Sequence, residues 1–143
     1  MGKIRDDLKH GKLAERRVHK ILETKFGELT HDPDQFANFD FYNERFCVEH
    51  KQRNINHDQY GDLFLERAKY DKYLELREEG KRCFIVWSCL DGMYVWEFED
   101  QFRGNDAVFY DETERINRKT HIQSSVVSHV FIEYVKKFDA LVI

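Results

Sequence analysis

The chain lacks the features that mark several large classes of protein. It has no hydrophobic run long enough to span a membrane, no low-complexity segment and no signal peptide. Its three cysteines, Cys47, Cys83 and Cys89, form no C-x-x-C pair, and two of them lie in apolar runs. We therefore expect reduced core cysteines in an intracellular protein without a membrane partner, located in the cytoplasm, the nucleoid or, for a viral source, the host cell.

An excess of positive charge is also missing. The formal net charge is −4, so the chain has no global basic field of the kind that signals nucleic-acid binding. A local cluster of Lys and Arg together with a metal ion can still supply positive potential where phosphates lie. The 143 residues, 41% of them hydrophobic, suit a single domain over residues 1–143 and leave no room for a second.

The most informative stretch is residues 36–54, where two strand-like runs meet at a short polar turn. The pattern predicts a β-hairpin, because aromatic and β-branched residues flank the turn. By alternation along each strand, Asp40 falls on one face of the first run, and Glu49 and Lys51 share one face of the second. A hairpin places its strands side by side, so these three charged side chains are expected to converge.

Such a convergence predicts a metal site. Two carboxylates close together in a partly dry place repel one another unless a cation lies between them. Mg²⁺ accepts oxygen ligands of this kind and keeps several waters for chemistry. Lys51 can hold a metal-bound water or neutralise charge that grows on a phosphate, and phosphodiester hydrolysis requires both.

The combination of Asp40 with Glu49-His50-Lys51 resembles the motif of the PD-(D/E)xK nucleases. The segment from Gly11 to Gly27 is similar to the opening helix of archaeal Holliday-junction resolvases, which carries a Glu near its start. The resemblance covers roughly residues 10–90. It implies an α/β (α+β) fold with a restriction-endonuclease-like αβββαβ core, in which helices flank a mixed central sheet. It also implies hydrolysis of nucleic acid, with DNA favoured, that depends on Mg²⁺ or Mn²⁺.

The resemblance also assigns roles to residues. Asp40, Glu49 and the His50 carbonyl would hold the ion, Glu15 would assist them, and Lys51 would aid the attacking water. The predicted catalytic set is thus Glu15, Asp40, Glu49 and Lys51. The family often places a phosphate-contacting Lys or Gln on its second helix, where Lys69 and Lys72 lie. Arg53 is the third expected nucleic-acid contact. Equally, the two lysines could simply belong to the charged face of that helix.

Glu15 is in register with Val18, Leu22 and Phe26 on a predicted amphipathic helix, so its carboxylate is expected to face the buried stripe. That position is costly for an unpaired charge. The residue is therefore either a third acidic group that reaches the metal or a boundary Glu that pairs with Arg16 or His19. We favour the first of these, because the hairpin motif lies downstream.

Two further choices concern loop residues. Pro33-Asp34 also precedes Glu49 at a tolerable distance, so Asp34 competes with Asp40 as the metal ligand. We favour Asp40, because the composition around Asp34 is typical of a loop. His57 and Asp58 also lie in a loop with no third partner nearby, and we interpret them as loop residues.

The remaining elements follow from periodicity. Helices are predicted over residues 4–26 and 62–79, and a Gly follows each. Strands are predicted over residues 28–31, 38–42, 46–51, 83–90, 93–98, 107–110 and 126–132. From residue 133 the spacing allows a helix, and an exposed apolar tail there could form a homodimer contact.

Two alternatives to a general nuclease stay open. A nuclease-like domain could bind nucleic acid or a protein without cleaving anything, although such domains usually lack a motif residue and this chain has them all. The chain could also be a Holliday-junction resolvase specifically, but that activity needs a dimer and a large basic surface.

Overall fold

The computed structural model describes residues 15–33, 39–98, 108–111, 115–116, 123–124 and 127–143. The first helix is described over residues 15–26, and α2 spans Arg67–Glu78. The strands are β1 Thr30–His31, β2 Phe41–Tyr42, β3 Phe46–Gln52, β4 Asp62–Glu66, β5 Arg82–Cys89, β6 Gly92–Glu97, β7 Val108–Asp111, β8 Arg115–Ile116, β9 Gln123–Ser124, β10 Val127–Phe131 and β11 Lys136–Lys137. Two short 3₁₀ helices, η2 Ile132–Tyr134 and η3 Phe138–Ala140, complete the list. None of the helices in these ranges is long and apolar enough to cross a membrane.

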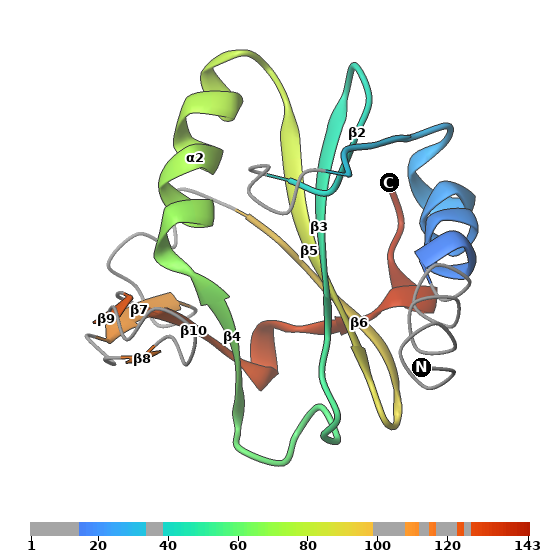
Figure 1. The fold of residues 1–143 in the computed structure, drawn as a ribbon. Coiled ribbons are helices and arrows are strands. Elements are labelled where there is room, and N and C mark those ends of the chain that lie inside the picture. Colours follow the sequence, from blue (N-terminus) through green and yellow to red (C-terminus); the bar gives the residue numbers. More distant parts are fainter. Residues whose placement is uncertain (1–14, 34–38, 99–107, 112–114, 117–122, 125–126) are drawn as a thin grey trace, which may run out of the picture.

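A six-stranded mixed sheet, in the order β1-β2-β3-β5-β6-β11, forms the centre of this α/β protein. Strands β3 and β5 run parallel, while every other neighbouring pair is antiparallel. Figure 1 shows α2 on one side of this sheet and the first helix on the other. The predicted mixed sheet flanked by helices is therefore confirmed, as are the strands predicted over residues 83–90 and 93–98.

The two faces of the central sheet bury separate hydrophobic clusters. Along β5, Cys83, Ile85 and Trp87 contribute to the cluster on the α2 side, which also contains Tyr73 of that helix. The alternate residues Phe84 and Val86 belong to the cluster on the other side, with Leu22 and Phe26 of the first helix. All five of these β5 side chains are completely buried. The continuous apolar run in β5 is thus explained by burial on both faces.

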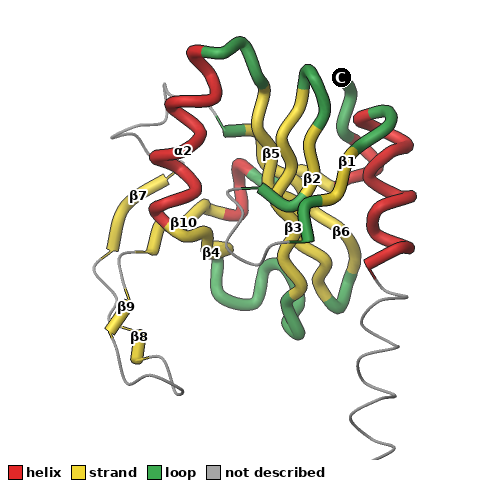
Figure 2. Tube along the Cα trace, turned by 45° about the horizontal axis from the view of Figure 1, so that its top comes forward, coloured by secondary structure: helices red, strands yellow, loops and turns green. Residues whose placement is uncertain are grey.

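The C-terminal segment runs beside the first helix, as Figures 1 and 2 show. The Lys25 ammonium donates hydrogen bonds of 3.0 Å to the carbonyl oxygens of Asp139 and Leu141. The helix allowed by the spacing from residue 133 is wrong, because β11 pairs with β6 and leaves only 3₁₀ turns around it. This arrangement buries Phe138 and Leu141 in the core, so only the last apolar residues of the tail are exposed.

The second helix begins later than its sequence pattern predicts. Residues 62–66 form β4, which pairs with β10 in a separate three-stranded sheet, β4-β10-β7. Leu63 and its partner Val130 are both buried in the α2-side cluster. Tertiary pairing has therefore overridden a local pattern that is compatible with either structure. The strands predicted over residues 107–110 and 126–132 are confirmed by β7 and β10.

Candidate functional site

Asp40 lies where β2 and β3 separate. Their ladder stops at the pair Phe41 and Val48, and Asp40 occupies a bend just before β2. Its Oδ2 atom accepts a 2.9 Å hydrogen bond from the backbone amide of His50. The bend also sends the neighbouring rings apart. Phe39 packs in the α2-side cluster and Phe41 in the other, although two residues this far apart in a regular strand would share one face.

A cavity of about 350 Å³ opens beside Asp40. It brings together Glu15 from the first helix, Asp40 from the bend and His50 from β3. The full lining is Glu15, Val18, His31, Asp40, Phe41, His50 and Gln52. Three of the predicted site residues, which lie up to 35 positions apart in the chain, thus border one space.

Glu15 is exposed at this cavity rather than turned into the core. The sequence offered His19 as an ion-pair partner of Glu15, but the His19 ring contacts other groups. His19 Nε2 lies 2.8 Å from the carbonyl oxygen of Leu29 and 3.6 Å from Glu23 Oε2. Glu15 therefore presents its carboxylate to solvent at the cavity edge, where an ion or a phosphate can approach.

Glu49 and Lys51 lie on the opposite face of β3 from His50. Alternation places them with Cys47, toward α2. Glu49 is 5% exposed, and its Oε1 atom is 3.9 Å from Lys51 Nζ. Neither side chain is among the described residues that line the cavity. A carboxylate this deeply buried stays ionised only beside a compensating positive charge, which Lys51 or a metal ion can provide.

The donor atoms around this part of β3 suit a hard divalent ion. Carboxylate oxygens come from Glu15, Asp40 and Glu49. The backbone of His50 adds a carbonyl oxygen. Their carboxylate atoms do not form a group of three within 4.8 Å, a spacing that the described residues reach only at His57, Asp58 and Asp91. Mg²⁺ needs no such protein cage, because it keeps several waters and is usually bound through one or two carboxylates together with substrate phosphates.

The surroundings of the His50 ring favour its neutral form. Burial lowers its pKa, and the nearby Asp40 carboxylate opposes this shift only in part. The Nε2 atom lies 2.8 Å from Ser88 Oγ on the neighbouring strand β5. This hydrogen bond fixes the ring at the cavity wall, so the His50 side chain helps to shape the cavity.

Two of the three predicted nucleic-acid contacts, Arg53 and Lys72, have described side chains. The Arg53 amide donates a 2.9 Å hydrogen bond to the Ser88 carbonyl, which holds the chain just after β3. Lys72 Nζ donates a 2.8 Å hydrogen bond to Glu75, and this bond raises the pKa of the lysine. That pairing fits the alternative of a charged helix face. Lys69 lies in α2, but its side chain is outside the described part of the structure.

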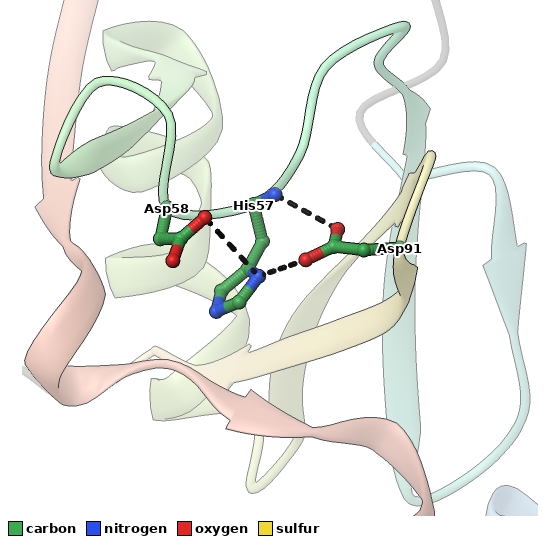
Figure 3. A group of neighbouring side chains, drawn as sticks. All are labelled: His57, Asp58 and Asp91. Carbon is green, nitrogen blue, oxygen red and sulfur yellow. Dashed lines mark hydrogen bonds and ion pairs between the residues drawn. The ribbon is translucent and has the colours of Figure 1, made fainter.

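Two residue groups were missed or left open by the sequence. His31 lines the cavity and stacks on Phe41 with ring centroids 4.8 Å apart, and only its pairing with β2 reveals this place. His57 and Asp58 do have a third partner, Asp91, which no local spacing indicates because it lies 34 residues away from His57 (Figure 3). Asp34 is outside the described residues, so the choice between it and Asp40 stays a prediction.

Comparisons of this chain with family models, with curated proteins and with solved structures give no match.

Proposed function

We propose that this protein is a Mg²⁺- or Mn²⁺-dependent nuclease that hydrolyses phosphodiester bonds, with DNA as the favoured substrate and a restriction-endonuclease-like core. The observation that carries the proposal is the bond from the His50 amide to Asp40 at the cavity that Glu15 also lines. It ties the acidic bend to the strand that carries Glu49 and Lys51. Buried Glu49 beside Lys51 gives further support.

In this proposal Asp40, Glu49 and the His50 carbonyl hold the ion, and Glu15 assists from the rim of the cavity. A bound Mg²⁺ would lower the pKa of a coordinated water and offset charge on the phosphate. The Lys51 ammonium would orient the attacking water and stabilise negative charge that develops in the transition state. The buried surroundings strengthen these interactions relative to those in bulk water.

The substrate backbone would approach along the end of β3. Arg53 directly follows this strand. The hydrogen bond from its backbone amide to the Ser88 carbonyl fixes the backbone at that point. Lys69 and Lys72 of α2 are the proposed contacts farther out. Such contacts position a phosphate backbone without reading its sequence, so we expect little sequence specificity.

One observation favours a second candidate, a nuclease-like module that binds nucleic acid without cleaving it. Glu49 and Lys51 face α2, whereas the cavity with Asp40 and Glu15 lies on the His50 side of the strand. A module of this kind would keep the fold and the phosphate contacts, while its acidic groups would not act together on one ion.

Cleavage assays distinguish the two candidates. Single-stranded, duplex and branched DNA and RNA are incubated with Mg²⁺, Mn²⁺ or EDTA, with wild type, Glu49→Gln and Lys51→Ala. Glu44→Gln is the matched control, because this carboxylate is exposed in the turn before β3. A nuclease cleaves with metal, loses cleavage in EDTA and in both site variants, and keeps it in the control. Binding to any of these substrates without cleavage under every metal condition supports the module instead.

A further inference from the structure

The loop of residues 53–61 is fastened to the carboxyl end of β5 and the turn that follows it. Three hydrogen bonds of 2.9 Å make this attachment. They run from the Arg53 amide to the Ser88 carbonyl, from the Leu90 amide to the Ile55 carbonyl, and from the His57 amide to Asp91 Oδ1. The position of His57 relative to Asp91 therefore follows from the backbone and not only from contact between the two side chains.

The imidazole of His57 is held in a defined orientation. It stacks on the Tyr94 ring, with centroids 3.9 Å apart and an angle of 11° between the planes. Its Nδ1 atom lies 2.5 Å from Asp91 Oδ2 and 4.0 Å from Asp58 Oδ1 (Figure 3). The Tyr94 hydroxyl also donates to Asp91 Oδ2, at 3.4 Å. The Nδ1 atom of His57 thus faces the carboxylates of Asp58 and Asp91, and Asp91 also accepts a hydrogen bond from Tyr94.

The charge at this cluster favours a cation. Asp58 and Asp91 place carboxylate oxygens within 4.8 Å of the His57 ligand nitrogen, and the 2.9 Å hydrogen bond from the His57 amide holds the Asp91 side chain in place. Asp58 has a largely exposed side chain, 67% accessible, so it can turn toward an ion with little rearrangement.

We propose that His57, Asp58 and Asp91 form a binding site for a divalent transition-metal ion, with Zn²⁺ preferred, that fastens this loop to the β5–β6 turn. All three ligand atoms lie within 4.8 Å of one another. Zn²⁺ binds imidazole nitrogen and carboxylate oxygen at about 2.0–2.2 Å, and three protein ligands leave a fourth position for water. Binding of the ion would release the proton between Nδ1 and Asp91 Oδ2 to solvent, and those two atoms would move apart to admit the ion.

This cation site is distinct in chemistry from the proposed nuclease site. A ligand set that contains imidazole favours Zn²⁺ over Mg²⁺, whereas the donors around Asp40 are all oxygens. Strand register links the two places, because Lys51 pairs with Trp87 and Trp87 pairs with Tyr94. The His57 ring on Tyr94 is therefore two strands from Lys51 on the same face of the sheet, roughly 10 Å away. The ion would fix the segment that directly follows β3.

Calorimetry and thermal unfolding of the untagged full chain test this proposal, with Zn²⁺ and Mg²⁺ as the probes. His57→Phe is the central variant, because it keeps an aromatic ring for Tyr94 and removes the ligand nitrogen. Wild type should bind one Zn²⁺ and melt at a higher temperature with it. His57→Phe should weaken Zn²⁺ binding about tenfold or more. Glu49→Gln, which alters the other site, should leave Zn²⁺ binding unchanged.

Asp58→Asn provides a second test that does not depend on the folding of His57→Phe, because its side chain is largely exposed. It should also weaken Zn²⁺ binding while the melting temperature without metal stays the same. The proposal is overturned if wild type shows no saturable Zn²⁺ binding, or if both variants bind Zn²⁺ as wild type does. Loss of Zn²⁺ binding in Glu49→Gln would also overturn it. Loss of Mg²⁺-dependent cleavage alone would affect only the nuclease proposal.

Discussion

The backbone amide of His50 donates a hydrogen bond to the side chain of Asp40, at 2.9 Å. The regular ladder between β2 and β3 has ended two residues earlier, at Val48. The carboxylate thus accepts a hydrogen bond from an amide that lies beyond the end of this ladder. This contact keeps Asp40 beside the strand of Glu49 and Lys51 even though Asp40 itself lies in a bend.

We predict that Asp40→Asn preserves the fold and impairs the proposed chemistry. The amide oxygen of asparagine can still accept the bond from His50, so the melting temperature should change little. The variant loses a charged ligand, so cleavage should fall about tenfold to hundredfold. Asp40→Ala should lose both the hydrogen bond and the charged ligand, and its free energy of unfolding should fall by about 1–3 kcal/mol because the partly buried His50 amide is left unsatisfied. Thermal unfolding and metal-dependent cleavage measure the two effects.

Asp34→Asn is the control for this prediction, since Asp34 is the competing aspartate of the same motif. It should leave cleavage close to that of wild type. If Asp34→Asn abolishes cleavage and Asp40→Asn retains it, the metal ligand is the other aspartate, and the bond between Asp40 and His50 is structural.

The second prediction concerns metal binding at Glu49. Glu49 is 5% exposed, and the proposed ion would offset the cost of burying its charge. Calorimetry should detect Mn²⁺ binding to wild type, and Glu49→Ala should remove it. Glu44→Ala, which changes an exposed carboxylate of the neighbouring turn, should bind Mn²⁺ as wild type does. Unchanged binding in Glu49→Ala would place the ion at another group.

The elements best predicted from the sequence are those whose burial matches a local pattern. The continuous apolar run from Cys83 predicts a strand covered on both faces, and β5 is buried on both. The start of α2 was less predictable, because residues 62–66 suit either a helix or a strand until β10 pairs with them. The C-terminal segment has the same ambiguity, which the pairing of β11 with β6 resolves.

The candidate site shows the same limit. Local alternation correctly separates Glu49 and Lys51 from His50, since all three lie on one regular strand. The same alternation does not predict where the Asp40 side chain points, because the bend at this residue interrupts the regular strand. The places of His31 and Asp91 follow only from contacts with distant segments, which no spacing in the sequence encodes.

The third prediction tests the core on which the site depends. Phe84 is completely buried. Its ring centroid lies 4.8 Å from that of Phe26 and 5.9 Å from that of Phe46. Phe84→Ala should lower the free energy of unfolding by about 3–5 kcal/mol, because it leaves a cavity between the sheet and the first helix. Leu90→Ala, at a position 70% exposed, should change it by less than about 0.5 kcal/mol. Urea denaturation measures both, and a small effect at Phe84 would contradict the packing described.

The last prediction concerns Lys51, whose Nζ atom lies 3.9 Å from Glu49 Oε1. If the site hydrolyses phosphodiesters, Lys51→Ala removes a positioned donor while the carboxylates stay in place to hold the ion. Loss of one such donor costs roughly 10²-fold or more in rate. Lys51→Ala should therefore still bind Mn²⁺ and cleave poorly. Lys51→Met, which keeps an apolar stem, separates lost charge from lost packing, and it should be equally inactive. Full activity in both variants would make Lys51 a structural partner of Glu49 and would remove the proposed catalytic cation from the nuclease.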